Sequence, residues 1–138
     1  MARDQASTIL VVEDDTSIQD LLQEVLVEEG YRVLRAADSA HGLHLAVADR
    51  PDMILLDIGL PLSSGADMLA RLRDDPTTRH IPVVALTGQP SPDGDRPRGF
   101  DGWIEKPFDL DVLLEQVGRL DERLDLATAS LTTANGRG

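Results

Sequence analysis

The sequence predicts an α/β protein built on a doubly wound parallel sheet. Strand-like apolar runs alternate along the chain with intervals that mostly have helical spacing. The runs cover residues 9–12, 32–35, 53–56, 82–86 and 102–105. The third and fourth are continuously apolar, as expected for central strands that are covered on both faces. We therefore expect five parallel strands with helices packed on the sheet.

Two helices are predicted between the first three runs. The first has apolar residues at spacings of three and four, and Gly30 follows as a stop signal. Its apolar stripe is Ile18, Leu21, Leu22, Val25 and Leu26. The second covers residues 39–49, contains Gly42, and has a weaker stripe of Leu43, Ala46 and Val47. These stripes are the expected buried faces.

Start signals mark two more helices. Ser64 and Asp67 have the spacing of a capping box, and Asp109 is placed to cap a last helix. By contrast, residues 88–98 contain three prolines and two glycines. A proline inside a helix costs roughly 3 kcal/mol. The fourth helix is therefore expected to be short or missing, with a loop in its place.

Length and composition fit one domain. The 138 residues, 41% of them hydrophobic, can bury a single core. The net charge of −12 disfavours nucleic acid and anionic membranes. Cysteine is absent, which excludes disulfides and thiolate sites. The first apolar run is too short for a signal sequence or a membrane span. We expect a cytoplasmic protein that binds neither nucleic acid nor membrane.

The C-terminal part allows two interpretations. Apolar residues there alternate spacings of three and four: Leu110, Leu113, Val117, Leu120, Leu124, Ala127 and Leu131. This heptad pattern predicts a homodimer through the C-terminal helix. Alternatively, the core face ends near Leu120 and the rest frays. We divide the chain into an N-terminal arm (1–7), a folded domain (8–120) and a tail (121–138) that extends the helix before becoming disordered.

Polar residues follow four of the five strands at the point where each one ends. Glu13 and Asp14 follow the first strand, Asp57 the third, Thr87 the fourth and Lys106 the fifth. The carboxyl ends of parallel strands share one edge, where ligands bind. Each residue alone could be a helix cap, a turn residue or a solvated charge. Their joint placement predicts a pocket with three carboxylates, a hydroxyl and an ammonium group.

These groups suit a divalent cation and a phosphoryl group. Mg²⁺, or Mn²⁺ in its place, takes oxygen ligands, so Asp14 and Asp57 suit it and Glu13 can act through water. Asp57 is the predicted nucleophile, because a carboxylate can attack phosphorus to form an acyl phosphate. Lys106 and the Thr87 hydroxyl would then stabilise the charge on the phosphoryl oxygens.

The motifs around these residues resemble the receiver domains of bacterial two-component response regulators, from about Thr8 to Leu120. They are ILVVEDD at 9–15, LLDIGLP at 55–61, Gly65, IPVVALT at 81–87 and GFDGWIEKPF at 99–108. The resemblance implies a flavodoxin-like sheet in the order 2-1-3-4-5, with Asp57 as phosphoacceptor. It also implies Mg²⁺ bound by Glu13, Asp14, Asp57 and the Gly59 carbonyl, and phosphoryl ligands in Thr87 and Lys106.

The resemblance further implies a phosphohistidine donor on a histidine kinase or histidine phosphotransfer protein. It implies a cis bond between Lys106 and Pro107. It also implies a switch in which Thr87 moves toward the phosphoryl group and an aromatic residue turns inward. Trp103 occupies that aromatic position. The chain is then a phosphoacceptor that assists its own phosphorylation and dephosphorylation, and not an enzyme.

Three functions follow from these patterns. The first is a stand-alone receiver that signals to a protein partner by a conformational switch or by onward phosphoryl transfer. The second is a receiver-like scaffold that does not switch and works by dimerisation. The third is a magnesium-dependent phosphohydrolase, which position 59 disfavours because it is glycine where such enzymes have a second aspartate. His41, His44 and His80 lie away from the strand ends and are interpreted as surface residues.

Overall fold

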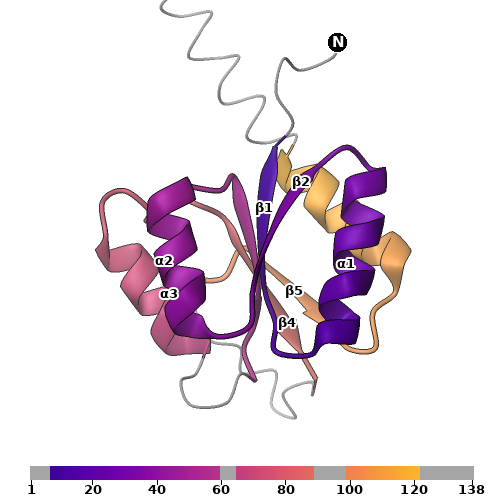
Figure 1. Ribbon diagram of the computed structural model, residues 1–138, viewed down its shortest axis with the longest axis horizontal. Coiled ribbons are helices and arrows are strands. Elements are labelled where there is room, and N and C mark those ends of the chain that lie inside the picture. Colours follow the sequence, from indigo (N-terminus) through magenta and orange to yellow (C-terminus); the bar gives the residue numbers. More distant parts are fainter. Residues whose placement is uncertain (1–6, 60–64, 89–98, 122–138) are drawn as a thin grey trace, which may run out of the picture. The chain divides into compact units, whose positions relative to one another are not determined.

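The computed structural model describes residues 7–59, 65–88 and 99–121, and it has a five-stranded parallel sheet (Figure 1). The strands are β1 (Thr8–Val12), β2 (Arg32–Ala36), β3 (Met53–Asp57), β4 (Val83–Thr87) and β5 (Gly102–Glu105). They lie in the order β2-β1-β3-β4-β5, and all neighbours are parallel. The predicted fold class and strand order are confirmed.

The register of the sheet brings the ends of the strands to one level. Val12 of β1 pairs with Leu56 of β3, so the residues that follow them, Glu13 and Asp57, begin at the same height. On the other side of β3, Asp57 pairs with Leu86 of β4. Because the strand order reverses between β1 and β3, a crevice is expected at this carboxyl edge.

Three helices belong to the same compact unit as the sheet: α1 (Thr16–Glu28), α2 (Ser39–Asp49) and α3 (Gly65–Asp74). Figure 1 shows α1 on one face of the sheet and α2 and α3 on the other. Apolar side chains of β1, β3, α2 and α3 form a buried core on the α2/α3 face. Its members include Leu10, Val12, Ala46, Ile54, Leu56, Met68 and Leu72. This core holds β1 and β3 side by side, which positions the residues at their ends.

The predicted buried faces of α1 and α2 are wrong in two positions. Leu21 and Val47 were expected to be buried, but they are 39% and 47% exposed. The buried residues are Gln19, Leu22 and Leu26 in α1, and Ser39, Gly42 and Ala46 in α2. A Cβ at Gly42 would lie 2.9 Å from Val12 Cγ2. The close approach of α2 to β1 therefore requires its smallest residue to face the sheet, which turns Val47 outward.

A further helix covers residues 110–121 and reaches the end of the described part of the chain. Asp109 Oδ1 accepts hydrogen bonds from the backbone N–H groups of Asp111 and Val112, which confirms the predicted cap. The chain divides into two compact units between Pro107 and Phe108, and this helix belongs to the second unit. No helix of the described residues is long and apolar enough to cross a membrane.

Several predictions fall on residues that the structure does not describe. The N-terminal arm up to residue 6, Ser64, the loop over 89–98 and the tail from residue 122 are all outside the described residues. Gly88 and residues 99–101, which flank the expected loop, are not helical. The loop, the arm and the dimer-forming tail therefore stay predictions.

Candidate functional site

Three carboxylates converge at the carboxyl edge of the sheet. Glu13, Asp14 and Asp57 each have a carboxylate oxygen within 4.8 Å of those of the other two. Glu13 is completely buried and Asp57 is 5% exposed, whereas Asp14 is exposed. We call these three residues and Lys106 the acidic site. The acids that the sequence placed at the ends of two strands are thus brought together.

The turn from β1 into α1 is shaped by its own acidic residues. Glu13 Oε2 accepts a hydrogen bond from the backbone N–H of Asp15 at 3.0 Å. Asp15 Oδ1 in turn caps α1 by accepting from the N–H groups of Ser17 and Ile18. Asp14 lies between these two anchored residues, so its backbone is held although its side chain is exposed.

Asp57 is anchored through both oxygens of its carboxylate. Oδ1 accepts from the backbone N–H of Gly59 at 2.9 Å, and Oδ2 accepts from Lys106 Nζ at 3.1 Å. A Cβ at Gly59 would lie 3.4 Å from Asp57 Oδ1, an ordinary contact, so packing does not require glycine there. Thr87 is 6% exposed and ends β4, the neighbour of β3. The roles of the Gly59 carbonyl and the Thr87 hydroxyl stay predictions.

Lys106 supplies the positive charge of the acidic site and is the only lysine in the chain. Its Nζ lies 2.6 Å from Glu13 Oε1 and 3.1 Å from Asp57 Oδ2, so it links the acids that follow β1 and end β3. Lys106 itself follows β5, which is the edge strand of the sheet beyond β4. The peptide bond between Lys106 and Pro107 is cis, which is the isomer that the resemblance implied.

The carboxylates exceed the positive charge that faces them. Burial raises the pKa of Glu13 to about 7 from 4.5, against the lowering effect of its hydrogen bonds from Lys106 and Asp15. The charge of Asp57 and a hydrogen bond with Asp14 raise this pKa further. Burial lowers the pKa of Lys106, but its hydrogen bonds to Glu13 and Asp57 outweigh burial and hold it above 10.5. Lys106 therefore stays charged. The carboxyl group of Glu13 is close to half-protonated at neutral pH.

The donor atoms of this site suit a hard divalent cation. All three ligand candidates offer carboxylate oxygens, which Mg²⁺ and Mn²⁺ prefer. One ammonium group neutralises only part of their charge, so a cation would offset both the burial that mainly raises the pKa of Glu13 and the added repulsion from Asp57. The three histidines are exposed and belong to no such group within the described residues. Their interpretation as surface residues is confirmed.

Trp103 lies on β5 and is half-buried. Its ring meets that of Phe100 edge to face, with centroids 5.4 Å apart and planes at 67°. Phe100 is partly buried and packs on the core of the α2/α3 face. The aromatic pair therefore connects β5 to this core, and the switch role of Trp103 stays a prediction.

One residue that contacts the acidic site, Gln19, was missed from the sequence. Gln19 is 7% exposed, and its Nε2 donates to the backbone carbonyl of Glu13 at 2.5 Å. Its spacing of three and seven from the buried Leu22 and Leu26 places it on the same helix face. The signal for Gln19 in the sequence was an amide side chain on the apolar face of α1. A buried polar group requires hydrogen-bond partners, so such an amide indicates a specific contact.

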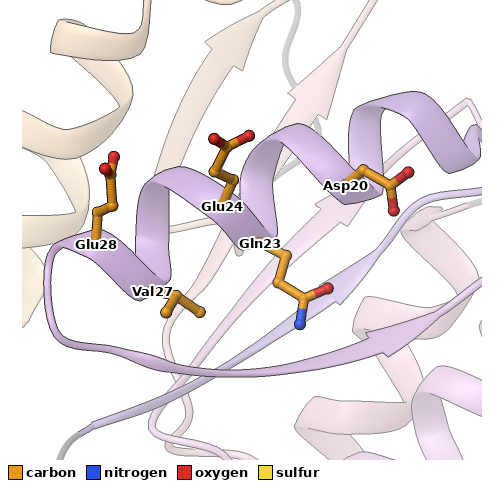
Figure 2. Close-up of a pocket in the computed structure, with 5 residues that line it drawn as sticks. All are labelled: Asp20, Gln23, Glu24, Val27 and Glu28. Carbon is orange, nitrogen blue, oxygen red and sulfur yellow. The ribbon is translucent and has the colours of Figure 1, made fainter.

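An open surface pocket of about 420 Å³ lies along α1 (Figure 2). It is lined by Asp20, Gln23, Glu24, Val27 and Glu28, all from that helix. None of these residues belongs to the acidic site. Two of them, Asp20 and Gln23, contact Arg35 of β2.

Fold and site together define a doubly wound α/β protein with clustered carboxylates at the carboxyl ends of β1 and β3, where the strand order reverses. The response regulator receiver domain family matches residues 9–118. The chain therefore belongs to this family, whose members act in two-component signal transduction.

Known relatives agree with this assignment. The DNA-binding dual master transcriptional regulator RpaA of a Synechocystis species is 41% identical over 85% of this chain, which spans only 50% of RpaA. The polar-differentiation response regulator DivK of Brucella anthropi is 34% identical over 80% of the chain and 92% of DivK. The receiver domain of sensor histidine kinase PA1611 from Pseudomonas aeruginosa superposes with a TM-score of 0.77 and 31% identity, over 83% of this chain and 97% of that one. That structure has a magnesium ion coordinated in its active-site cleft.

Proposed function

We propose that this chain accepts a phosphoryl group on Asp57 and transmits the signal by a conformational switch to a protein partner. The observation that carries the proposal is the environment of Asp57. Its carboxylate is held by the Gly59 N–H and by Lys106, with the carboxylates of Glu13 and Asp14 close by. The donor is a phosphohistidine on a histidine kinase or histidine phosphotransfer protein, the partner class that membership of the family supports.

In the proposed reaction, a carboxylate oxygen of Asp57 forms a bond to phosphorus as the bond from phosphorus to the donor imidazole nitrogen breaks. The electron pair of the broken bond goes to the imidazole, and the product is an acyl phosphate on Asp57. Lys106 remains protonated, so its charge offsets that of the phosphoryl oxygens. The Thr87 hydroxyl is the second proposed ligand of those oxygens.

A divalent cation is the proposed cofactor. Mg²⁺ or Mn²⁺, bound by Glu13, Asp14, Asp57 and the Gly59 carbonyl, supplies charge neutralisation for the transferred phosphoryl group. The convergent carboxylate oxygens and the raised pKa of Glu13 support this cofactor. The magnesium ion in the PA1611 receiver domain supports it as well.

Phosphorylation of the chain with a small donor tests the proposal. Incubation with Mg²⁺ and acetyl phosphate should add one phosphoryl group to the wild-type chain and none to Asp57→Asn, as measured by intact mass spectrometry. In the same samples, the fluorescence of Trp103, the only tryptophan, should change in the wild type, because the proposed switch moves Thr87 and turns Trp103 inward.

The matched control is Asp74→Asn, which removes an exposed carboxylate from the last turn of α3 that does not belong to the acidic site. It should be phosphorylated like the wild type. A wild-type chain that stays unmodified, or an Asp57→Asn chain that still gains the group, contradicts the assignment of Asp57. Phosphorylation without any change in fluorescence contradicts the switch at Trp103 alone.

A further inference from the structure

The backbone carbonyl of Glu13 has a dedicated side-chain donor. The ladder between β1 and β2 ends at the pair Val12 and Ala36, after which Glu13 N–H still donates to the Ala36 carbonyl at 3.0 Å. The Glu13 carbonyl lies beyond this ladder, on a residue that is completely buried. A buried carbonyl requires a donor, and Gln19 Nε2 supplies it at 2.5 Å. The same nitrogen donates to the Ala36 carbonyl at 3.0 Å.

Arg35 of β2 sets the orientation of the Gln19 amide. Its Nε and Nη2 donate to Gln19 Oε1 at 3.1 Å and 2.9 Å. A guanidinium group can only donate, so the amide oxygen must face Arg35 and the amide nitrogen must face the two carbonyls. Arg35 is held in turn by Gln23 Oε1 at 2.6 Å and by Asp20 at 2.8 Å.

These contacts hold the turn that carries two of the three acids. On one side, Gln19 holds the Glu13 carbonyl. On the other side, Asp15 is tied to the Glu13 carboxylate and to the start of α1. The peptide unit between Glu13 and Asp14 is thus held by the carbonyl that Gln19 contacts. Without that hydrogen bond, the Glu13 carbonyl would lose its side-chain donor. The peptide unit between Glu13 and Asp14 would then rotate toward another donor.

We propose that Gln19 is a positioning residue for the acidic site, and that Arg35 keeps it in the productive orientation. Gln19 touches neither the cation nor the phosphoryl group, and it acts through the main chain of Glu13. The inference rests on the proposed cation site. Residues that orient metal ligands typically change metal affinity by about 10- to 100-fold when they are removed.

The test is cation binding to the purified chain, measured from the electron paramagnetic resonance signal of free Mn²⁺. Gln19→Met keeps the length of the side chain and removes both amide donors. It should weaken Mn²⁺ binding by about tenfold or more. The matched control is Gln23→Met, one turn further along α1, which loses only its contact with Arg35 and should bind Mn²⁺ like the wild type.

Thermal unfolding without metal separates positioning from a purely structural role. A merely structural Gln19 would lower the melting temperature of Gln19→Met but leave the Mn²⁺ affinity of the folded chain unchanged, and this result would overturn the inference. If Gln19→Met does not fold, Arg35→Met decides, because Arg35 lies at the partly exposed end of the network. It should weaken Mn²⁺ binding severalfold, and unchanged binding would overturn the inference. A wild-type chain that binds no Mn²⁺ would overturn the proposed cation site together with this inference.

Discussion

Two regions at opposite edges of the sheet are each built around one cationic side chain. At the carboxyl edge, Lys106 faces Glu13 and Asp57. At the amino edge, Arg73 of α3 donates to Asp101 at 3.0 Å and to the backbone carbonyls of Arg79, Ile81 and Gly99. Asp101 Oδ2 also accepts from the N–H of Val83, the first residue of β4. We call this second region the Arg73 network.

The two regions differ in whether their charges balance. In the Arg73 network, one guanidinium meets one carboxylate and three backbone carbonyls, so the two opposite charges balance. In the acidic site, the one ammonium group of Lys106 contacts two of three clustered carboxylates, and burial, together with the charge of Asp57, raises the pKa of Glu13 to about 7. A balanced network stabilises the fold, whereas an unbalanced one retains affinity for a further positive charge. This imbalance of charge distinguishes the acidic site from the Arg73 network and supports the proposed cation site.

The largest expected effect comes from removing the lysine. Lys106→Met leaves Glu13 and Asp57 buried without their common donor, and losing one partner of a buried ion pair costs about 3 kcal/mol. Without metal, the free energy of unfolding measured by urea denaturation should fall by about this amount at pH 8. Added Mg²⁺ should restore part of the loss in the variant, because it supplies the missing positive charge. A loss that Mg²⁺ leaves untouched contradicts an unbalanced site.

The second effect is a pH dependence caused by Glu13. Between pH 4.5 and 7 the folded chain holds a proton that the unfolded chain has lost, because folding raises the pKa of Glu13. Its contribution to stability is thus fully present below pH 4.5 and is lost as the pH rises through 7. Relative to Glu13→Gln, which cannot titrate, the wild type without metal should lose about 2 kcal/mol of unfolding free energy between pH 5 and 7.

Urea denaturation of both chains at pH 5, 6 and 7 measures this difference. Mg²⁺ should reverse the trend for the wild type, since a metal ligand must be deprotonated. A constant difference between the two chains across this range would show that Glu13 titrates normally.

The smallest effect is expected at the Arg73 network. Arg73→Met leaves Asp101 and three carbonyls without this donor, but the side chains of Arg73 and Asp101 are 29% and 35% exposed, so water replaces part of the loss. The unfolding free energy should fall by about 1 to 2 kcal/mol. Mg²⁺ affinity and phosphorylation by acetyl phosphate should not change. The control Arg71→Met, an exposed neighbour on α3, should have wild-type stability. Altered Mg²⁺ affinity in Arg73→Met would mean that the two edges are coupled.

The ends of the strands could be predicted from the sequence, because a buried strand is an apolar run and the first polar residues after it mark its end. Glu13, Asp14 and Asp57 were located in this way, and the parallel arrangement implied that they share an edge. The strand order came from the resemblance to receiver domains and not from the pattern of residues, because apolar runs do not record which strands are neighbours.

The tertiary structure alone decided the rest. The rotation of α2 depends on the contact of Gly42 with Val12, and that of α1 on burying Gln19, so the hydrophobicity of Val47 or Leu21 could not reveal either. The partners of Lys106 lie up to 93 positions away and depend on strand register. The sequence specifies which side chains lie at the carboxyl end of each strand. Distances, protonation and orientation arise only when those groups are packed together, because burial and charge interactions depend on all of them at once.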